Sequence, residues 1–228
     1  MIEQILLYER DLFLALNGSS SRLLDAIMWL FSGAIMWIPI GAFFIYSITY
    51  KRNYKEWLPF FCGVALLILF CDGFSSGICK PYFMRLRPTH HPLFMEEVKT
   101  LFNYRGGQYG FISGHATNFF GFAMFSALIM KNKVYSWIIF IWAALIAYSR
   151  VYLGVHFISD IVPGAIAGCI IGALTYGLYS LAIKYSPICV AKPVTNTRIM
   201  ARRIALVLVI NIVIFSLMSR DIIEYIQE

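Results

Sequence analysis

Six long apolar runs dominate the sequence and limit the folds that are open to it. The runs cover residues 23–50, 57–78, 114–130, 134–149, 158–184 and 203–219. A helix that crosses a bilayer needs roughly 20 predominantly apolar residues. Only 14% of the residues are charged, against about 25% in soluble domains. We therefore predict an all-α fold: one polytopic membrane domain, residues 1–228, with about six transmembrane helices.

The N-terminal segment has a different character from these runs. Its apolar residues are interrupted by Glu3, Glu9, Arg10 and Asp11, unlike the basic head and uninterrupted apolar core of a cleaved signal peptide. The pattern favours an amphipathic helix that lies on the membrane surface and ends near Asn17.

Positive charge is distributed unevenly among the loops. Segments 51–55, 131–133 and 184–203 together hold ten Lys and Arg residues, and they fall on one side if six spans alternate. The positive-inside rule makes that side cytoplasmic. Segments 79–113 and 150–157 then share the outer face. None of the basic runs is long enough to follow a nucleic-acid backbone, so we expect no nucleic-acid partner.

The outer face keeps cations that membrane orientation does not explain. Lys80 and Arg87 stand seven residues apart in the stretch KPYFMRLRP, so a helix would carry them on one face until Pro88 ends it. Taken alone, the two cations could equally extend to lipid headgroups at the end of a span.

A second polar cluster, Ser113-Gly114-His115, comes directly before the third apolar run. The N-terminus of a helix presents unpaired N–H groups and a positive dipole end, which suit an anion. Gly114 would let that anion approach the backbone closely. The alternative is that Ser113 simply caps the helix and His115 is an interfacial histidine.

The third cluster is SRVYLGVHFISD, residues 149–160. His156 and Asp160 are four residues apart and would share a helix face, where the carboxylate would fix the imidazole tautomer. Gly154 suggests a turn that lets Arg150 and His156 converge. The pair could instead be structural. A zinc site built from two histidines and an aspartate is a further alternative, but the neighbouring cations would repel a metal ion.

Together the three clusters contain what phosphoryl transfer requires. Several cations and backbone N–H groups can hold phosphate oxygens and stabilise the charge of the transition state. One histidine can attack phosphorus while the other protonates the leaving group.

These stretches resemble the three signature motifs of the type 2 phosphatidic acid phosphatase (PAP2) superfamily. The resemblance is strongest over residues 80–160. The matching positions are Lys80, Arg87, Pro88, Ser113, Gly114, His115, Ser149, Arg150, His156 and Asp160. The second motif departs from the usual pattern, because Ile112 replaces a proline that restricts the backbone before the anion cradle.

The resemblance implies a role for each matching residue. His156 would be the nucleophile that forms a phosphohistidine, Asp160 would orient it, and His115 would be the general acid. The implied phosphate-binding residues are Lys80, Arg87, Ser113, Gly114 and Arg150. The scheme needs no metal ion and no cofactor.

The sequence thus predicts a lipid phosphatase of a bacterial cytoplasmic membrane, with its active site facing the periplasm. Undecaprenyl diphosphate is the first substrate expected. Lipid A is the nearest alternative, followed by phosphatidylglycerol phosphate and phosphatidic acid. Two other classes stay open: a lipid phosphotransferase, and a catalytically silent lipid-binding or transport protein on the same scaffold.

Overall fold

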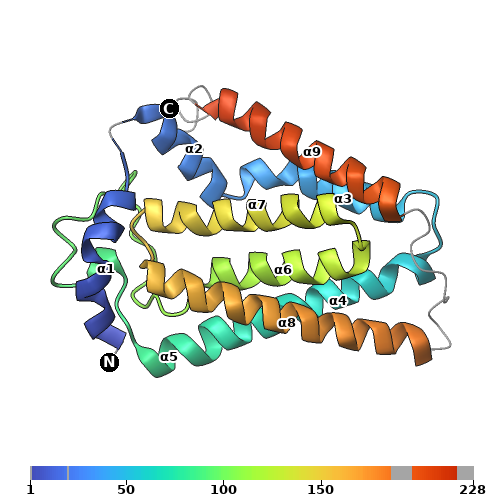
Figure 1. Ribbon diagram of the computed structural model, residues 1–228, viewed down its shortest axis with the longest axis horizontal. Coiled ribbons are helices and arrows are strands. Elements are labelled where there is room, and N and C mark those ends of the chain that lie inside the picture. The colour runs from blue at the N-terminus through green and yellow to red at the C-terminus, as the bar shows by residue number, and fades with distance from the viewer. Residues whose placement is uncertain (1, 20, 186–196, 220–228) are drawn as a thin grey trace.

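The computed structural model describes residues 2–19, 21–185 and 197–219, which fold into helices and loops without a β-strand (Figure 1). The α-helices are α1 (Ile2–Leu16), α2 (Arg22–Ser32), α3 (Ile38–Thr49), α4 (Tyr54–Asp72), α5 (Lys80–Phe83), α6 (Gly114–Met130), α7 (Lys133–Tyr152), α8 (Ile158–Tyr185) and α9 (Thr197–Leu217). Shorter helical turns cover Ile35–Trp37, Gly73–Cys79 and Pro88–His90. The predicted all-α fold is confirmed.

Helix α6 lies in the middle of the bundle, where it packs against α4, α7 and α8. The contact with α8 is the closest, and glycines make it possible. A Cβ atom on Gly168 would lie 2.3 Å from the backbone oxygen of Thr117, and one on Gly172 would lie 2.4 Å from that of Gly121. Small residues let membrane helices approach at backbone distance, so the sequence of α8 fixes its position against α6.

Within the described residues, four helical segments are long and apolar enough to cross a membrane, and a fifth qualifies if a bent pair counts as one span. The protein is therefore an integral membrane protein, but the predicted count of six spans is not confirmed. The bent pair is the predicted run 23–50, which breaks by 68° between Arg22–Ser32 and Ile35–Thr49. The break begins where the extended backbone of Gly33 ends α2.

Helix α6 explains the other shortfall in the number of spans. Its 17 residues reach only about 25 Å at 1.5 Å per residue, which is less than the roughly 30 Å of a hydrocarbon core. The helix is short because the preceding chain, which carries the second motif, enters the bundle before turning helical at Gly114. The beginning of α6 is therefore recessed below the loops.

The two ends of the bundle differ, as Figure 1 shows. The connections from α3 to α4 and from α6 to α7 lie at one end, which agrees with the side predicted for 51–55 and 131–133. Helix α1 and the loops that follow α5 and α7 lie at the other end. Most of the third basic segment, 184–203, falls outside the described residues.

Helix α1 lies across the end of the bundle instead of along it (Figure 1). Leu6 and Phe13 are buried against the protein, whereas Ile5, Tyr8 and Leu12 are exposed on the opposite face. The predicted amphipathic N-terminal helix is thus present, and it ends before Asn17 as expected.

Candidate active site

The first motif begins on a helix and continues in a loop. Helix α4 passes through the π-helical turn Gly73–Cys79 into α5, where the Lys80 ammonium donates to Ser76 Oγ at 2.8 Å. Met84 then takes a left-handed conformation with φ of 43° and ends the helix. Arg87 follows in extended backbone. The prediction that Lys80 and Arg87 share a helix face is therefore wrong, because the helix stops well before Pro88.

Arg87 instead reaches the third motif directly. Its Nη1 atom lies 3.0 Å from His156 Nε2 and donates to the Val155 backbone oxygen at 2.9 Å. Its Nε atom donates to the Tyr109 oxygen at 3.2 Å. Three contacts therefore place the guanidinium beside one ring nitrogen of a buried histidine.

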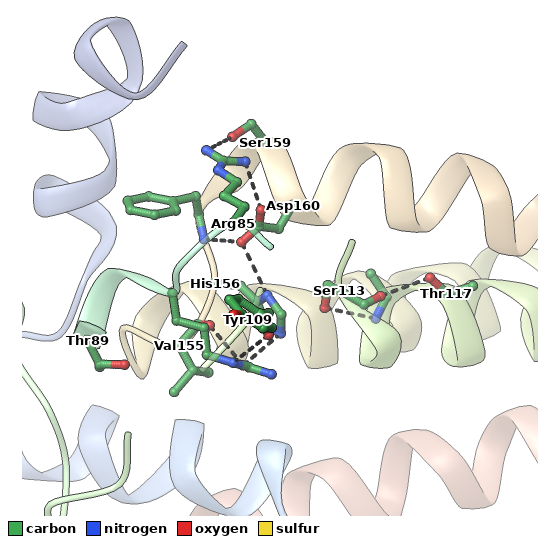
Figure 2. Close-up of polar contacts among 12 residues, drawn as sticks. Arg85, Thr89, Tyr109, Ser113, Thr117, Val155, His156, Ser159 and Asp160 are labelled. Atoms are coloured by element: carbon green, nitrogen blue, oxygen red, sulfur yellow. Dashed lines mark hydrogen bonds and ion pairs between the residues drawn. The ribbon is translucent and has the colours of Figure 1, made fainter. Parts of the chain in front are cut away.

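The other ring nitrogen of His156 faces Asp160. Nδ1 lies 3.3 Å from Asp160 Oδ2, and the same oxygen accepts the Phe157 N–H at 3.0 Å (Figure 2). The pairing is as predicted, but the geometry is not, because His156 precedes α8 and only Asp160 lies on the helix. Gly154, with φ of +71°, makes the expected turn after α7. Since the carboxylate accepts the Nδ1 proton, Nε2 carries the ring's lone pair, and it faces the Arg87 guanidinium.

Burial and nearby positive charges favour the neutral form of His156. The ring lies between two membrane-spanning helices, and removal from water lowers the pKa of His156 well below its ordinary value of 6.5. The positive charges of Arg87, Arg150 and Lys80 lower it further, in that order. The neutral imidazole is the form that can act as a nucleophile.

The second motif is tied to the third through backbone contacts. Ser113 is fully buried, and its N–H donates to the Asp160 backbone oxygen at 3.0 Å. Its Oγ accepts a hydrogen bond from the Ala116 N–H at 3.4 Å, so Ser113 caps α6, as one of the two interpretations of the sequence predicted. A Cβ atom on Gly114 would lie 3.7 Å from Lys80 Nζ. The ammonium group thus lies beside the helix N-terminus, together with the hydroxyl groups of Ser75 and Ser76.

Arg150 and His115 are the last two of the predicted site residues, and neither makes a hydrogen bond with His156. Arg150 lies in the last turn of α7, where its guanidinium donates to Tyr104 Oη at 3.0 Å and to Ser32 Oγ. His115 is partly exposed on α6 and has no hydrogen-bond partner in the described part of the chain. It borders an apolar groove of about 630 Å³ that runs between α3, α4, α6, α7 and α9.

All eight predicted site residues lie toward the end of the bundle that carries α1 and the loops after α5 and α7, but their contacts differ. Arg87, His156, Asp160 and Ser113 form one connected group, and Lys80 lies beside Gly114. In the described ranges, no three His, Cys, Asp or Glu residues gather closely enough to hold a metal ion. Ile112, which stands in place of the motif proline, is buried.

Sequence reasoning assigned no site role to Arg85, Ser159 and Glu9, which form a hydrogen-bonded group that reaches Asp160 through Arg85. Arg85 Nη1 donates to Asp160 Oδ1 at 2.8 Å, and its Nη2 donates to Ser159 Oγ at 2.7 Å and to Glu9 Oε1 at 3.0 Å. Arg85 stands between the matching positions of the first motif, and Glu9 is far away in the chain. The one available signal was that Glu9 lies between Leu6 and Phe13 on the buried face of α1, where an acid needs a partner.

Comparison with known proteins identifies the family. The PAP2 superfamily model matches residues 60–184. A lipid A 4'-phosphatase from Porphyromonas gingivalis is 47% identical over 181 residues, which cover 79% of this chain and 77% of that protein. An undecaprenyl-diphosphatase from Sulfolobus acidocaldarius is 29% identical over 78% of this chain and 82% of its own.

The fold comparison agrees with the sequence comparison. A crystal structure of LpxE from Aquifex aeolicus has 25% sequence identity and a TM-score of 0.50, and the match covers 73% of this chain and 93% of that chain. The motifs, the helical membrane fold and these relatives all indicate the same family. The chain belongs to the PAP2 superfamily and is a membrane lipid phosphatase.

Proposed function

We propose that this enzyme removes a phosphate group from lipid A. The observation that carries the proposal is the 47% identity to a lipid A 4'-phosphatase across 79% of the chain. The undecaprenyl-diphosphatase is a much more distant relative at 29% identity. Undecaprenyl diphosphate, the first substrate expected from the sequence, therefore gives way to the lipid A alternative.

The apolar groove supports a substrate with acyl chains. Its walls are aromatic and aliphatic, with Trp37, Phe44, Phe122 and Trp142 among them, and it reaches His115. Burial of apolar surface stabilises a bound chain by about 25 cal/mol per Å². An acyl chain in this groove would hold the lipid while its phosphate lies among the cations beside His156.

The proposed reaction has two steps. The Nε2 lone pair of His156 attacks phosphorus and forms a phosphohistidine, while the bond to the sugar oxygen breaks. His115 donates its proton to that oxygen, so the dephosphorylated lipid leaves as an alcohol. His115 then takes a proton from water, which attacks the phosphohistidine and releases inorganic phosphate. Asp160 accepts the Nδ1 hydrogen bond throughout and stabilises the positive ring.

The cations have a separate task in this mechanism. Arg87, Lys80 and Arg150 would neutralise the phosphate oxygens, and the N–H groups at the start of α6 would bind one of them. Arg87 donates to His156 Nε2 at 3.0 Å, so an arriving phosphate would take over this donor and free the nucleophile.

The basic loops support a location in the bacterial cytoplasmic membrane with the site facing the periplasm. Segments 51–55 and 131–133 carry five Lys and Arg residues and lie at the end of the bundle opposite the site (Figure 1). Positive loops stay in the cytoplasm. The site would then act on lipid in the outer leaflet.

A substrate panel tests the proposal. Detergent-purified protein is given lipid A, undecaprenyl diphosphate, phosphatidylglycerol phosphate or phosphatidic acid, and released phosphate is measured beside His156→Ala. We expect kcat/KM for lipid A to exceed the others by about tenfold or more, which corresponds to about 1.4 kcal/mol. Mass spectrometry of the product identifies the phosphate lost. Preferred turnover of undecaprenyl diphosphate would overturn the substrate assignment. Phosphorylation of an added acceptor lipid would instead identify a phosphotransferase.

A further inference from the structure

The carboxylate that holds the proposed nucleophile is itself held by a buried cation. Asp160 Oδ2 faces the His156 ring, and Asp160 Oδ1 accepts a hydrogen bond from Arg85 Nη1 at 2.8 Å (Figure 2). The Asp160 side chain is 0% exposed and that of Arg85 is 2% exposed. A buried guanidinium this close cancels much of a carboxylate charge. Asp160 would then stabilise a positively charged ring only weakly.

Helix α1 supplies a second carboxylate, Glu9, whose negative charge offsets the positive charge of Arg85. Arg85 Nη2 donates to Glu9 Oε1 at 3.0 Å, and the Glu9 side chain is 10% exposed. The second oxygen of Glu9 accepts the Ser159 N–H at 2.9 Å, and Ser159 Oγ also donates to Glu9. Glu9 therefore lies against both Arg85 and the N-terminus of α8, which also carries Asp160.

These contacts form one line of charges that ends at His156: Glu9, Arg85, Asp160, then the imidazole. Two carboxylates and one guanidinium leave a net negative charge facing the ring. The opposite side of the ring is positive. The charged and titratable groups that act on His156 from other elements are Lys80, Arg87, Arg150 and His115.

We propose that Glu9 and Arg85 are positioning residues for the phosphatase reaction. Arg85 fixes the Asp160 carboxylate, and Glu9 offsets the charge of Arg85 so that Asp160 can stabilise the phosphohistidine. The proposal rests on the reaction given above, with His156 as nucleophile. It assigns a role in catalysis to the N-terminal helix, which lies outside the matched family region 60–184.

Anchoring of α1 alone is the competing explanation, and the chain offers a matched control for it. Arg10, the next residue on α1, pairs at the surface with Glu97, which is not part of the line of charges. Arg10→Gln removes an anchor of α1 without changing any charge in the line. Glu9→Gln removes one carboxylate charge but keeps the shape of the side chain.

The test compares wild type with Glu9→Gln, Arg85→Gln, the double variant and Arg10→Gln, using the lipid phosphate that wild type hydrolyses fastest. We expect Glu9→Gln to lower kcat about tenfold with little change in KM, as loss of one buried charge partner would do. The acid limb of its pH–rate profile should move down by about half a unit, because the uncompensated Arg85 charge disfavours imidazolium. Arg85→Gln should move that limb up, because Asp160 regains its full charge.

The double variant and the control make the test decisive. Opposite shifts should cancel in Glu9→Gln/Arg85→Gln, whose acid limb should return near that of wild type although kcat stays low. Arg10→Gln should keep both kcat and the profile. A merely structural role lowers the folded fraction, which scales the rate without moving the limb. An unmoved acid limb in Glu9→Gln, or shifts of the same sign in the two single variants, would overturn the proposal.

A second readout does not depend on turnover. The His156 ring can be titrated by NMR in histidine-labelled protein, with its signal assigned through its loss in His156→Gln. Opposite movements of this titration in the two single variants support the line of charges even if lipid A proves not to be the substrate. Absent movements would contradict it even if lipid A hydrolysis is confirmed.

Discussion

At the scale of single residues, the site depends on a glycine as much as on the polar side chains around it. A Cβ atom on Gly110 would lie 2.9 Å from Asp160 Oδ2 and 3.6 Å from His156 Nδ1. Real Cβ atoms do not approach an oxygen that closely, and Asp160 is fixed on its other side by Arg85. The loop therefore needs a glycine where it crosses the His156–Asp160 pair.

Gly110→Ala should accordingly reduce activity while the bundle stays folded. Displacement of the pair misplaces Nε2, and a misplacement of about 1 Å can cost 10²-fold in rate. The control is Gly107→Ala in the same loop, where an added Cβ meets nothing within 4 Å. The measurement is phosphate release at equal amounts of folded protein. Equal rates for the two variants would contradict the packing argument.

The neutral state of His156 predicts how activity responds to acid. Because burial and three cations lower the pKa of His156 well below 6.5, the proposed nucleophile should stay unprotonated as the pH falls through that value. We expect kcat/KM to persist below pH 6.5 and to decline only at a more acidic pH. The measurement is a pH–rate profile from about pH 4 to 8. A loss of half the activity near pH 6.5 that NMR assigns to His156 would contradict it.

The three motifs were readable from the sequence because each one is local. Ser113-Gly114-His115 and the pair His156 and Asp160 occupy fixed spacings, and the turn at Gly154 was signalled by the residue itself. The contact between Arg87 and His156 was not readable, since it depends on the left-handed turn at Met84, a residue that rarely adopts that conformation. Arg85 and Glu9 were hidden for a similar reason, because only tertiary packing joins them.

At the scale of elements, the contact between α6 and α8 sets the distance between the second and third motifs. Glycines of α8 face backbone oxygens of α6, and the Ser113 N–H bonds to the Asp160 oxygen where the two helices begin. A wider separation of the helices would break that bond and pull the anion cradle away from His156.

Gly168→Ala should therefore destabilise the protein, since its Cβ would lie 2.3 Å from the Thr117 backbone oxygen. Overpacking of this kind costs about 1–3 kcal/mol. Gly177→Ala on the same helix is the matched control, because an added Cβ there meets nothing within 4 Å. The midpoint of thermal unfolding in detergent should fall for the first variant and hold for the second. If the midpoint fell equally in both variants, the loss of stability would come from replacing a glycine in α8 and not from the contact with α6, which would contradict the prediction.

Helix α6 also shows why the number of spans was overestimated. Hydropathy identifies apolar runs, and 114–130 is apolar because it packs between neighbouring helices, with Ala116, Ala123 and Phe125 fully covered. A helix surrounded by other helices needs no contact with lipid and no full spanning length. Composition alone does not separate these two reasons for being apolar.

At the scale of the whole molecule, the proposed orientation gives a direct test in intact cells. In a cysteine-free background, Arg105→Cys and Lys133→Cys place one exposed thiol at each end of the bundle. A maleimide that does not cross the inner membrane should label position 105 and leave position 133 unlabelled until the cells are opened. Labelling of position 133 alone in intact cells would reverse the orientation and put the site on the cytoplasmic side.

Helix α1, which lies across the end of the bundle, carries a practical consequence. The helix begins at Ile2, and Glu9 lies about two helical turns further along it. A bulky group attached to the first turn of this helix would lie about two turns from Glu9, the first charge in the line that ends at His156. Trimming the first dozen residues, although they precede the matched family region, would remove one of the three charges in the line that ends at His156.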